Sequence, residues 1–99
     1  MSTVLNMAPH TERAWRDAHP AFTPAEVLVL LVLAREADRV QGARFEISQT
    51  EISEMARVSI RTVGSALSIL EKSGYIRRGM VFDSATGKRL ASWTEMVSA

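Results

Sequence analysis

The residues best suited to bind a ligand follow Ser59 at intervals of three or four positions. Arg61, Ser65, Ser68 and Lys72 would share one side of a helix that turns by about 100° per residue. Guanidinium, ammonium and hydroxyl groups bind phosphate oxygens and base edges, and short serine side chains let a helix approach a groove closely. This polar stripe fits the major groove of DNA, but on amphipathicity alone it is more typical of a solvated outer helix face.

Catalytic or metal-binding groupings are not found in the sequence. The two histidines, His10 and His19, lie near the start, and the chain has no cysteine and no glycine-rich phosphate loop. Ser59 and Ser65 have no potential general base close in sequence. The acidic residues are explained by helix ends and solvated faces. We therefore expect neither an enzyme nor a cofactor nor a metal site.

Two adjacent helix signals place the polar stripe on the second helix of a pair. Ser48-Gln49-Thr50-Glu51 is a capping box, which predicts that the first helix begins there. Ser59 is a second N-cap, and Gly74 is suited to the left-handed turn that ends a helix at about Ser73. Opposite the stripe, helical spacing predicts a buried face made of Val63, Ala66, Leu67 and Leu70.

A longer helix precedes this pair. Thr23-Pro24-Ala25-Glu26 combines an N-cap threonine, a proline at the first helical position and a glutamate at the third, and predicts a helix to about Val40, ended by Gly42. Its segment 27–34 is apolar on all sides, which predicts a core helix covered on most faces. That segment of eight residues is far shorter than the roughly twenty that cross a bilayer, so we expect no membrane partner.

The N-terminal part divides into an arm and a short helix. Residues 1–10 show no periodicity and predict a flexible arm, and residues 11–99 predict a single domain. Thr11 to His19 predicts two helical turns with Ala14, Trp15 and Ala18 toward one side. Trp15 would plug the edge of the core or make a dimer contact, and large aromatic side chains favour the core.

Strand signals flank the helix pair. Arg44 to Ile47 alternates and predicts a short strand with Phe45 and Ile47 inward. Residues 75–82 and 89–97 predict a hairpin around the polar turn 83–88, with Trp93 packed under the sheet. The hairpin carries four basic residues: Arg77, Arg78, Lys88 and Arg89. They could contact DNA phosphates, or they could equally protect an edge strand against aggregation.

Charge is segregated along the chain. The formal net charge is only +1, which argues against strong electrostatic attraction of nucleic acid by the whole molecule. From residue 56 to residue 90, however, seven basic and two acidic residues give +5, whereas the remainder, with five basic and nine acidic residues, gives −4. A one-sided contact with DNA needs this kind of distribution.

The residues of the helix pair and its exit carry a family resemblance. The segment Glu51 to Val63, followed by Ala66-Leu67, Leu70-Glu71-Lys72 and Gly74-Tyr75-Ile76-Arg77-Arg78, resembles the winged helix-turn-helix domains of bacterial, plasmid and phage DNA-binding proteins. Ser53 departs from the usual small alanine, and Arg57 stands where the turn usually has glycine. If the turn needs a positive φ, Arg57 costs on the order of 1 kcal/mol.

The resemblance implies an α+β fold with three core helices, a short strand and a C-terminal β-hairpin wing, to which this chain adds a short N-terminal helix. It implies binding of double-stranded DNA in the cytoplasm, by a transcriptional regulator or a replication or mobile-element accessory factor. Gln49, Thr50 and Ser59 would hold the DNA backbone. Base edges would meet Arg61, Thr62, Ser65 and Ser68. Sequence-independent attraction would come from Arg57, Lys72, Arg77, Arg78, Lys88 and Arg89.

A protein-interaction module is the alternative function. A phage-type inhibitor or an assembly subunit would keep the winged fold and bind a protein instead of DNA. The near-neutral net charge favours this alternative, as do Ile60 and Ile69, which flank the polar stripe and are expected to be exposed. A homodimer is expected on general grounds, because two half-sites multiply specificity, but the sequence does not locate its interface.

Overall fold

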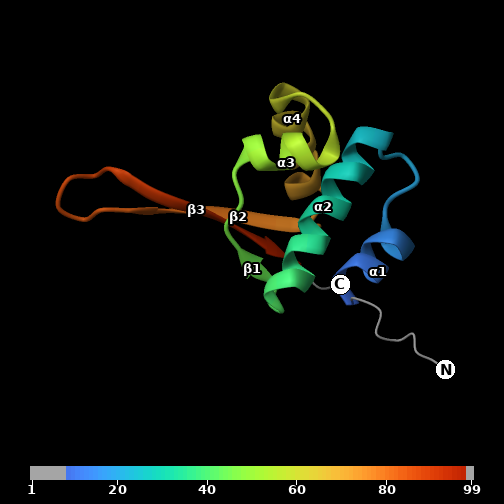
Figure 1. The fold of residues 1–99 in the computed structure, drawn as a ribbon, viewed down its shortest axis with the longest axis horizontal. Helices are drawn as coiled ribbons and strands as arrows, with labels where there is room; N and C mark the ends of the chain where they lie inside the picture. The colour runs from blue at the N-terminus through green and yellow to red at the C-terminus, as the bar shows by residue number, and fades with distance from the viewer. Residues whose placement is uncertain (1–8, 98–99) are drawn as a thin grey trace.

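The computed structural model describes residues 9–97, apart from the side chains of residues 89–91. Its elements in chain order are α1 (Pro9–Asp17), α2 (Pro24–Val40), β1 (Arg44–Phe45), α3 (Gln49–Ala56), α4 (Ile60–Lys72), β2 (Ile76–Phe82) and β3 (Arg89–Met96). The helices pack together at one end of the sheet, and the β2–β3 hairpin projects away from them as a wing (Figure 1). The predicted α+β winged helix-turn-helix fold is confirmed.

Helix α2 is central to the core and packs against α1, α3 and α4. It begins as predicted, because the Thr23 hydroxyl accepts a hydrogen bond from the Glu26 N–H (3.2 Å) and the Glu26 carboxylate accepts one from the Thr23 N–H (2.9 Å). Its fully covered side chains confirm the prediction of a core helix: Val29, Leu30, Leu33, Ala34 and Ala37. Burying each large aliphatic side chain stabilises the fold by about 1.5–3 kcal/mol.

The end of α2 corrects one sequence prediction. Gln41, and not Gly42, adopts the left-handed conformation, with φ 56°. Its N–H donates to the Asp38 carbonyl, and the Gly42 N–H donates to the Ala37 carbonyl. These two bonds satisfy carbonyls at the helix end. The end of α2 is therefore stabilised by backbone hydrogen bonds, which allow a residue with a side chain, Gln41, in the left-handed conformation.

The α3–α4 pair follows its predicted caps. The Ser48 hydroxyl and the Glu51 carboxylate exchange hydrogen bonds with each other's backbone N–H groups, both at 3.0 Å. The Ser59 hydroxyl accepts from the Thr62 N–H at 3.1 Å. Arg57 has φ 61°, so the turn does require a left-handed residue. The Ser53 hydroxyl donates to the Val58 carbonyl, so the serine that departs from the family pattern satisfies a backbone group of this turn.

The sheet has the order β1-β3-β2 and is antiparallel throughout. Strand β1 is shorter than predicted: it spans only two residues, paired with Glu95 and Thr94, because the chain then leaves the sheet to reach the cap of α3. Phe45 is buried and Ile47 packs against the core, as expected. In the hairpin, Val81 pairs with Ala91 and Phe82 with Arg89, so the backbone of residue 90 has no partner and forms a bulge.

Helix α1 differs from its prediction at both ends. It begins at Pro9, so Pro9 and His10 belong to the helix and not to an arm, and it ends at Asp17; residues 1–8 lie outside the described part of the chain. The Asp38 carboxylate anchors its start by accepting from the N–H groups of His10 and Thr11, both at 2.9 Å, and from the Thr11 hydroxyl at 2.7 Å.

The prediction that Trp15 plugs the core is wrong, since its side chain is 66% exposed. Ala14 is buried and Ala18 packs against the core. A helix rotates by about 100° per residue, so when Ala14 and Ala18 face the core, the neighbouring Trp15 is rotated toward solvent.

Candidate nucleic-acid interface

The polar stripe lies on the outer side of α4. Arg61, Ser65 and Lys72 are exposed and Ser68 is half-buried, whereas Val63, Ala66, Leu67 and Leu70 are at most 3% exposed. The local sequence produces this arrangement, because apolar residues recur at helical spacing on one side alone. The stripe is therefore available to a large ligand along the length of the helix.

The start of α4 uses two predicted site residues for its own structure. Besides capping the Thr62 N–H, the Ser59 hydroxyl donates to the Thr62 hydroxyl at 2.8 Å. The Thr62 hydroxyl oxygen keeps one lone pair and Ser59 has no further proton to give, so their capacity to bind a ligand is reduced. Arg61 lies beside this cap, is exposed and forms no ion pair with any other residue that the structure describes.

Gln49 and Thr50 lie at the start of α3 and are exposed. The Gln49 carboxamide oxygen lies against α4, where a Cβ placed on Gly64 would be 3.6 Å from it. Gln49 also lines a groove of about 320 Å³, here called the wing groove, between the α3–α4 pair and the hairpin. Residues of the helices and of the wing meet there: Ile52, Leu67, Glu71, Arg78, Met80 and Ser92.

The basic residues of the predicted interface form two groups. Arg77 and Arg78 are held in ion pairs, with Glu95 at 2.7 Å and with Glu71 at 2.9 Å. Among the described residues from 57 to 88, the cations that form no ion pair are Arg57, Arg61, Lys72 and Lys88. The side chain of Arg89 lies outside the described residues. Electrostatic attraction of a polyanion therefore depends most on the unpaired group.

The base of the wing has a stacked arrangement that sequence reasoning missed. The Trp93 ring lies across Gly79, where an added Cβ would come within 2.2 Å of the ring. The Arg44 guanidinium lies 4.0 Å from the ring centroid and makes a cation–π contact with it. Trp93 thus packs against the sheet, as expected. A glycine inside a predicted strand was the available signal, since it often marks a close approach of another group.

Exposed apolar side chains surround the polar stripe and continue onto the wing. Ile60 is 50% and Ile69 38% exposed, as expected. Met80, Val81 and Phe82, which the sequence analysis did not single out, are each about half exposed. These side chains make the neighbourhood of the stripe less uniformly polar than its sequence suggests.

Comparison with known proteins gives one match. A model of the Crp-like helix-turn-helix domain family matches residues 25–83, which run from the start of α2 through β2 into the turn of the wing. Neither a curated protein nor a solved structure matches the chain significantly. Within the described residues, no helix is long and apolar enough to cross a membrane, and no three His, Asp or Glu residues are grouped to hold a metal ion.

Proposed function

The chain belongs to the Crp-like helix-turn-helix domain family, and from that premise we propose that it binds double-stranded DNA as a transcriptional regulator. The observation that carries this proposal is the outward-facing polar stripe on α4, whose cations Arg61 and Lys72 form no ion pair with a described acidic residue. A helix of this kind fits a major groove about 12 Å wide. A replication or mobile-element accessory role would use the same surface.

Each predicted residue takes a role consistent with its position. Arg61, at the exposed start of α4, and Ser65 and Ser68, one and two turns further along, read base edges, because all three lie on the side of the helix that faces away from the core. Thr62 flanks them. Backbone phosphates are held by the exposed start of α3, at Gln49 and Thr50, and by the backbone N–H groups at the start of α4, beginning at Ser59, whose hydroxyl proton is already donated to Thr62.

Long-range attraction comes mainly from the unpaired cations Arg57, Lys72 and Lys88, with Arg89 at the wing. Arg77 and Arg78 contribute less to it, because each already has a carboxylate partner. In this proposal the chain acts as one domain from the start of α1 at Pro9 onward, and catalysis has no part in it.

Selection of bound duplexes from a random pool, followed by electrophoretic shift across a salt series, tests this function. We expect enrichment of a defined sequence, and log Kobs that falls linearly with log salt concentration. If the protein binds as a homodimer, the enriched sequence will be an inverted repeat with half-site centres about 10 base pairs apart. Failure to retard any duplex at low salt would refute the proposal.

A second function, docking of a protein partner, is favoured by one specific observation. Ile60 and Ile69 are exposed beside the polar stripe, and apolar side chains at such positions suit a protein interface. The two functions predict different results for one pair of variants. If the stripe binds DNA, Ile60→Ser and Ile69→Ser leave the affinity for duplex DNA and its salt dependence unchanged. If it docks a protein, the wild type retards no duplex, and both variants lose co-purification of the protein partner.

A further inference from the structure

The wing exposes three successive apolar residues. Met80, Val81 and Phe82 are 53%, 47% and 55% exposed. Strand β1 pairs with β3 only at Thr94 and Glu95, so at these three positions the described sheet is a two-stranded ribbon. A two-stranded ribbon has little core of its own, and contiguous apolar surface left in water marks an interaction site.

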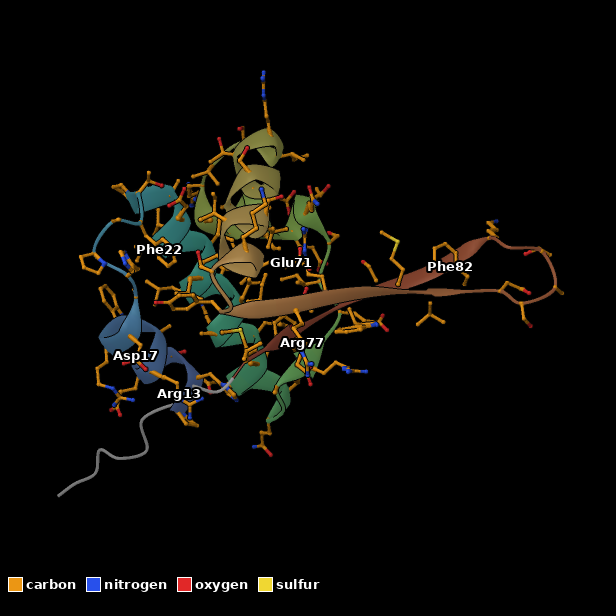
Figure 2. All side chains as sticks on the ribbon, turned by 180° about the vertical axis from the view of Figure 1, so that it is seen from behind. Arg13, Asp17, Phe22, Glu71, Arg77 and Phe82 are labelled. Atoms are coloured by element: carbon orange, nitrogen blue, oxygen red, sulfur yellow. The ribbon has the colours of Figure 1, made fainter. Side chains whose placement is uncertain are left out.

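Two of these side chains lie on the same side of β2 as Glu71 of α4. Side chains alternate along a strand, so Met80 and Phe82 share the side of β2 from which Arg78 reaches Glu71 on α4, and Met80 lines the wing groove. Figure 2 shows Phe82 and Glu71 on the same side of the wing and Arg77 on the other. Val81 therefore occupies the side that faces away from the groove.

The charges of the segment that forms α4 and the wing favour one kind of occupant. From residue 57 to residue 88, four described cations form no ion pair, whereas both acidic residues are engaged. Glu71 pairs with Arg78, and the Asp83 carboxylate accepts hydrogen bonds from the N–H groups of Ala85 and Thr86. A segment with this excess of positive charge attracts a polyanion and disfavours contact with the same segment of a second copy.

We propose that Met80 and Phe82 form an apolar wedge that enters the minor groove of the bound duplex, beside the major groove that receives α4, and partly unstacks one base step. This inference rests on the proposed DNA binding. Apolar side chains inserted in this way bend a duplex by about 20–90°. The wedge gives the protein a preference for flexible pyrimidine–purine steps such as TA, a preference that no side chain on α4 could supply at that position.

Energy transfer between dyes at the two ends of a 24-base-pair duplex tests the wedge. Two probes are used, one rich in A·T pairs with central TA steps and one G·C-rich without them, each at saturating protein in low salt. The variants are Met80→Ser and Phe82→Ser, and Val81→Ser is the matched control on the opposite side of the same strand. Circular dichroism of each variant checks that the fold is retained.

We expect wild-type protein and Val81→Ser to increase energy transfer in the TA-containing duplex more than in the G·C-rich duplex. Phe82→Ser should lose at least half of that increase, and Met80→Ser a smaller part. The salt dependence of binding should be the same for all variants, because no cation is removed.

Four results would overturn the wedge. Binding without bending by the wild type, or equal bending by Phe82→Ser, would overturn it and leave DNA binding intact. Absence of binding to both duplexes would refute DNA binding and the wedge together. A wild-type dimer that Phe82→Ser dissociates in sedimentation without DNA, with bending unchanged, would assign these side chains to a second copy of the chain.

Discussion

Arg78 on β2 and Glu71 on α4 form an ion pair, with 2.9 Å between Nη2 and Oε1, that ties the base of the wing to the last turn of α4. A second bond, from Arg78 Nε to the same oxygen at 3.2 Å, fixes the guanidinium in the plane of the contact. The pair positions the wing relative to α4 and also occupies a cation that phosphate would otherwise attract.

Glu71→Gln should therefore strengthen DNA binding. Loss of the carboxylate frees Arg78 for phosphate and removes a negative charge from the interface, so the plot of log Kobs against log salt should steepen by about one unit. The free energy of unfolding should change by less than about 1 kcal/mol, because the pair is partly exposed. Glu12→Gln on α1, outside the interface, is the matched control; an identical increase in that variant would contradict the assignment.

Arg61→Ala and Lys88→Ala should weaken binding in different ways. Arg61 contacts base edges in the proposed complex, so its loss should cost about 1–3 kcal/mol and relax base preference at one position. Lys88 should contribute only to sequence-independent attraction, so its loss should weaken binding to all duplexes and reduce the salt dependence by about one unit. Competition titrations against a panel of point-mutated duplexes separate the two effects. Equal losses of specificity in both variants would be inconsistent with these roles.

Gly79→Ala should destabilise the wing. The added methyl group would meet the Trp93 ring at 2.2 Å, and overpacking of this kind costs about 1–3 kcal/mol. Urea denaturation should show the loss, whereas Gly42→Ala, whose nearest contact would be 3.9 Å away, should change stability by less than about 1 kcal/mol. The double variant Gly79→Ala with Trp93→Ala should recover part of the loss. A Gly79→Ala protein as stable as wild type would show that the stacking does not constrain the wing.

Arg57→Gly should separate stability from binding. Glycine relieves the left-handed strain at φ 61°, so the free energy of unfolding should rise by about 1 kcal/mol. The same change removes an unpaired cation, so DNA binding should weaken and its salt dependence should decrease. Arg57→Ala removes the cation but keeps the strain, and should weaken binding to the same extent without raising the melting temperature.

Asp38 should make the attachment of α1 sensitive to acid. Burial raises the pKa of this carboxyl, but hydrogen bonds from Thr11 and His10 together lower it by more than burial raises it. In the folded protein the pKa of Asp38 therefore lies below the ordinary value of 3.8. A group with a depressed pKa contributes stability that is complete above its unfolded-state pKa and is lost as pH falls through the folded-state pKa. The free energy of unfolding should therefore fall more steeply below about pH 4 in wild type than in Asp38→Ala. Identical pH profiles would contradict this linkage.

The sequence by itself determined the elements whose signals are local. Capping at Thr23, Ser48 and Ser59 and the apolar spacing of α4 involve residues within one or two helical turns, so helix starts and the buried face followed directly. The family resemblance raised the question of a positive φ at Arg57, and the structure answers it with φ 61°. The family model agrees with the resemblance carried by these segments.

Only the tertiary structure decided which cations are unpaired, how Trp93 lies on Gly79, and that Trp15 faces solvent. Arg77 and Arg78 meet Glu95 and Glu71 across 18 and 7 positions of the chain, and such partners depend on strand register and helix packing. Short-range sequence patterns carry no information about strand register or helix packing. The same basic residue on a hairpin is a free cation or an ion-pair partner, depending on which residue the fold places opposite it.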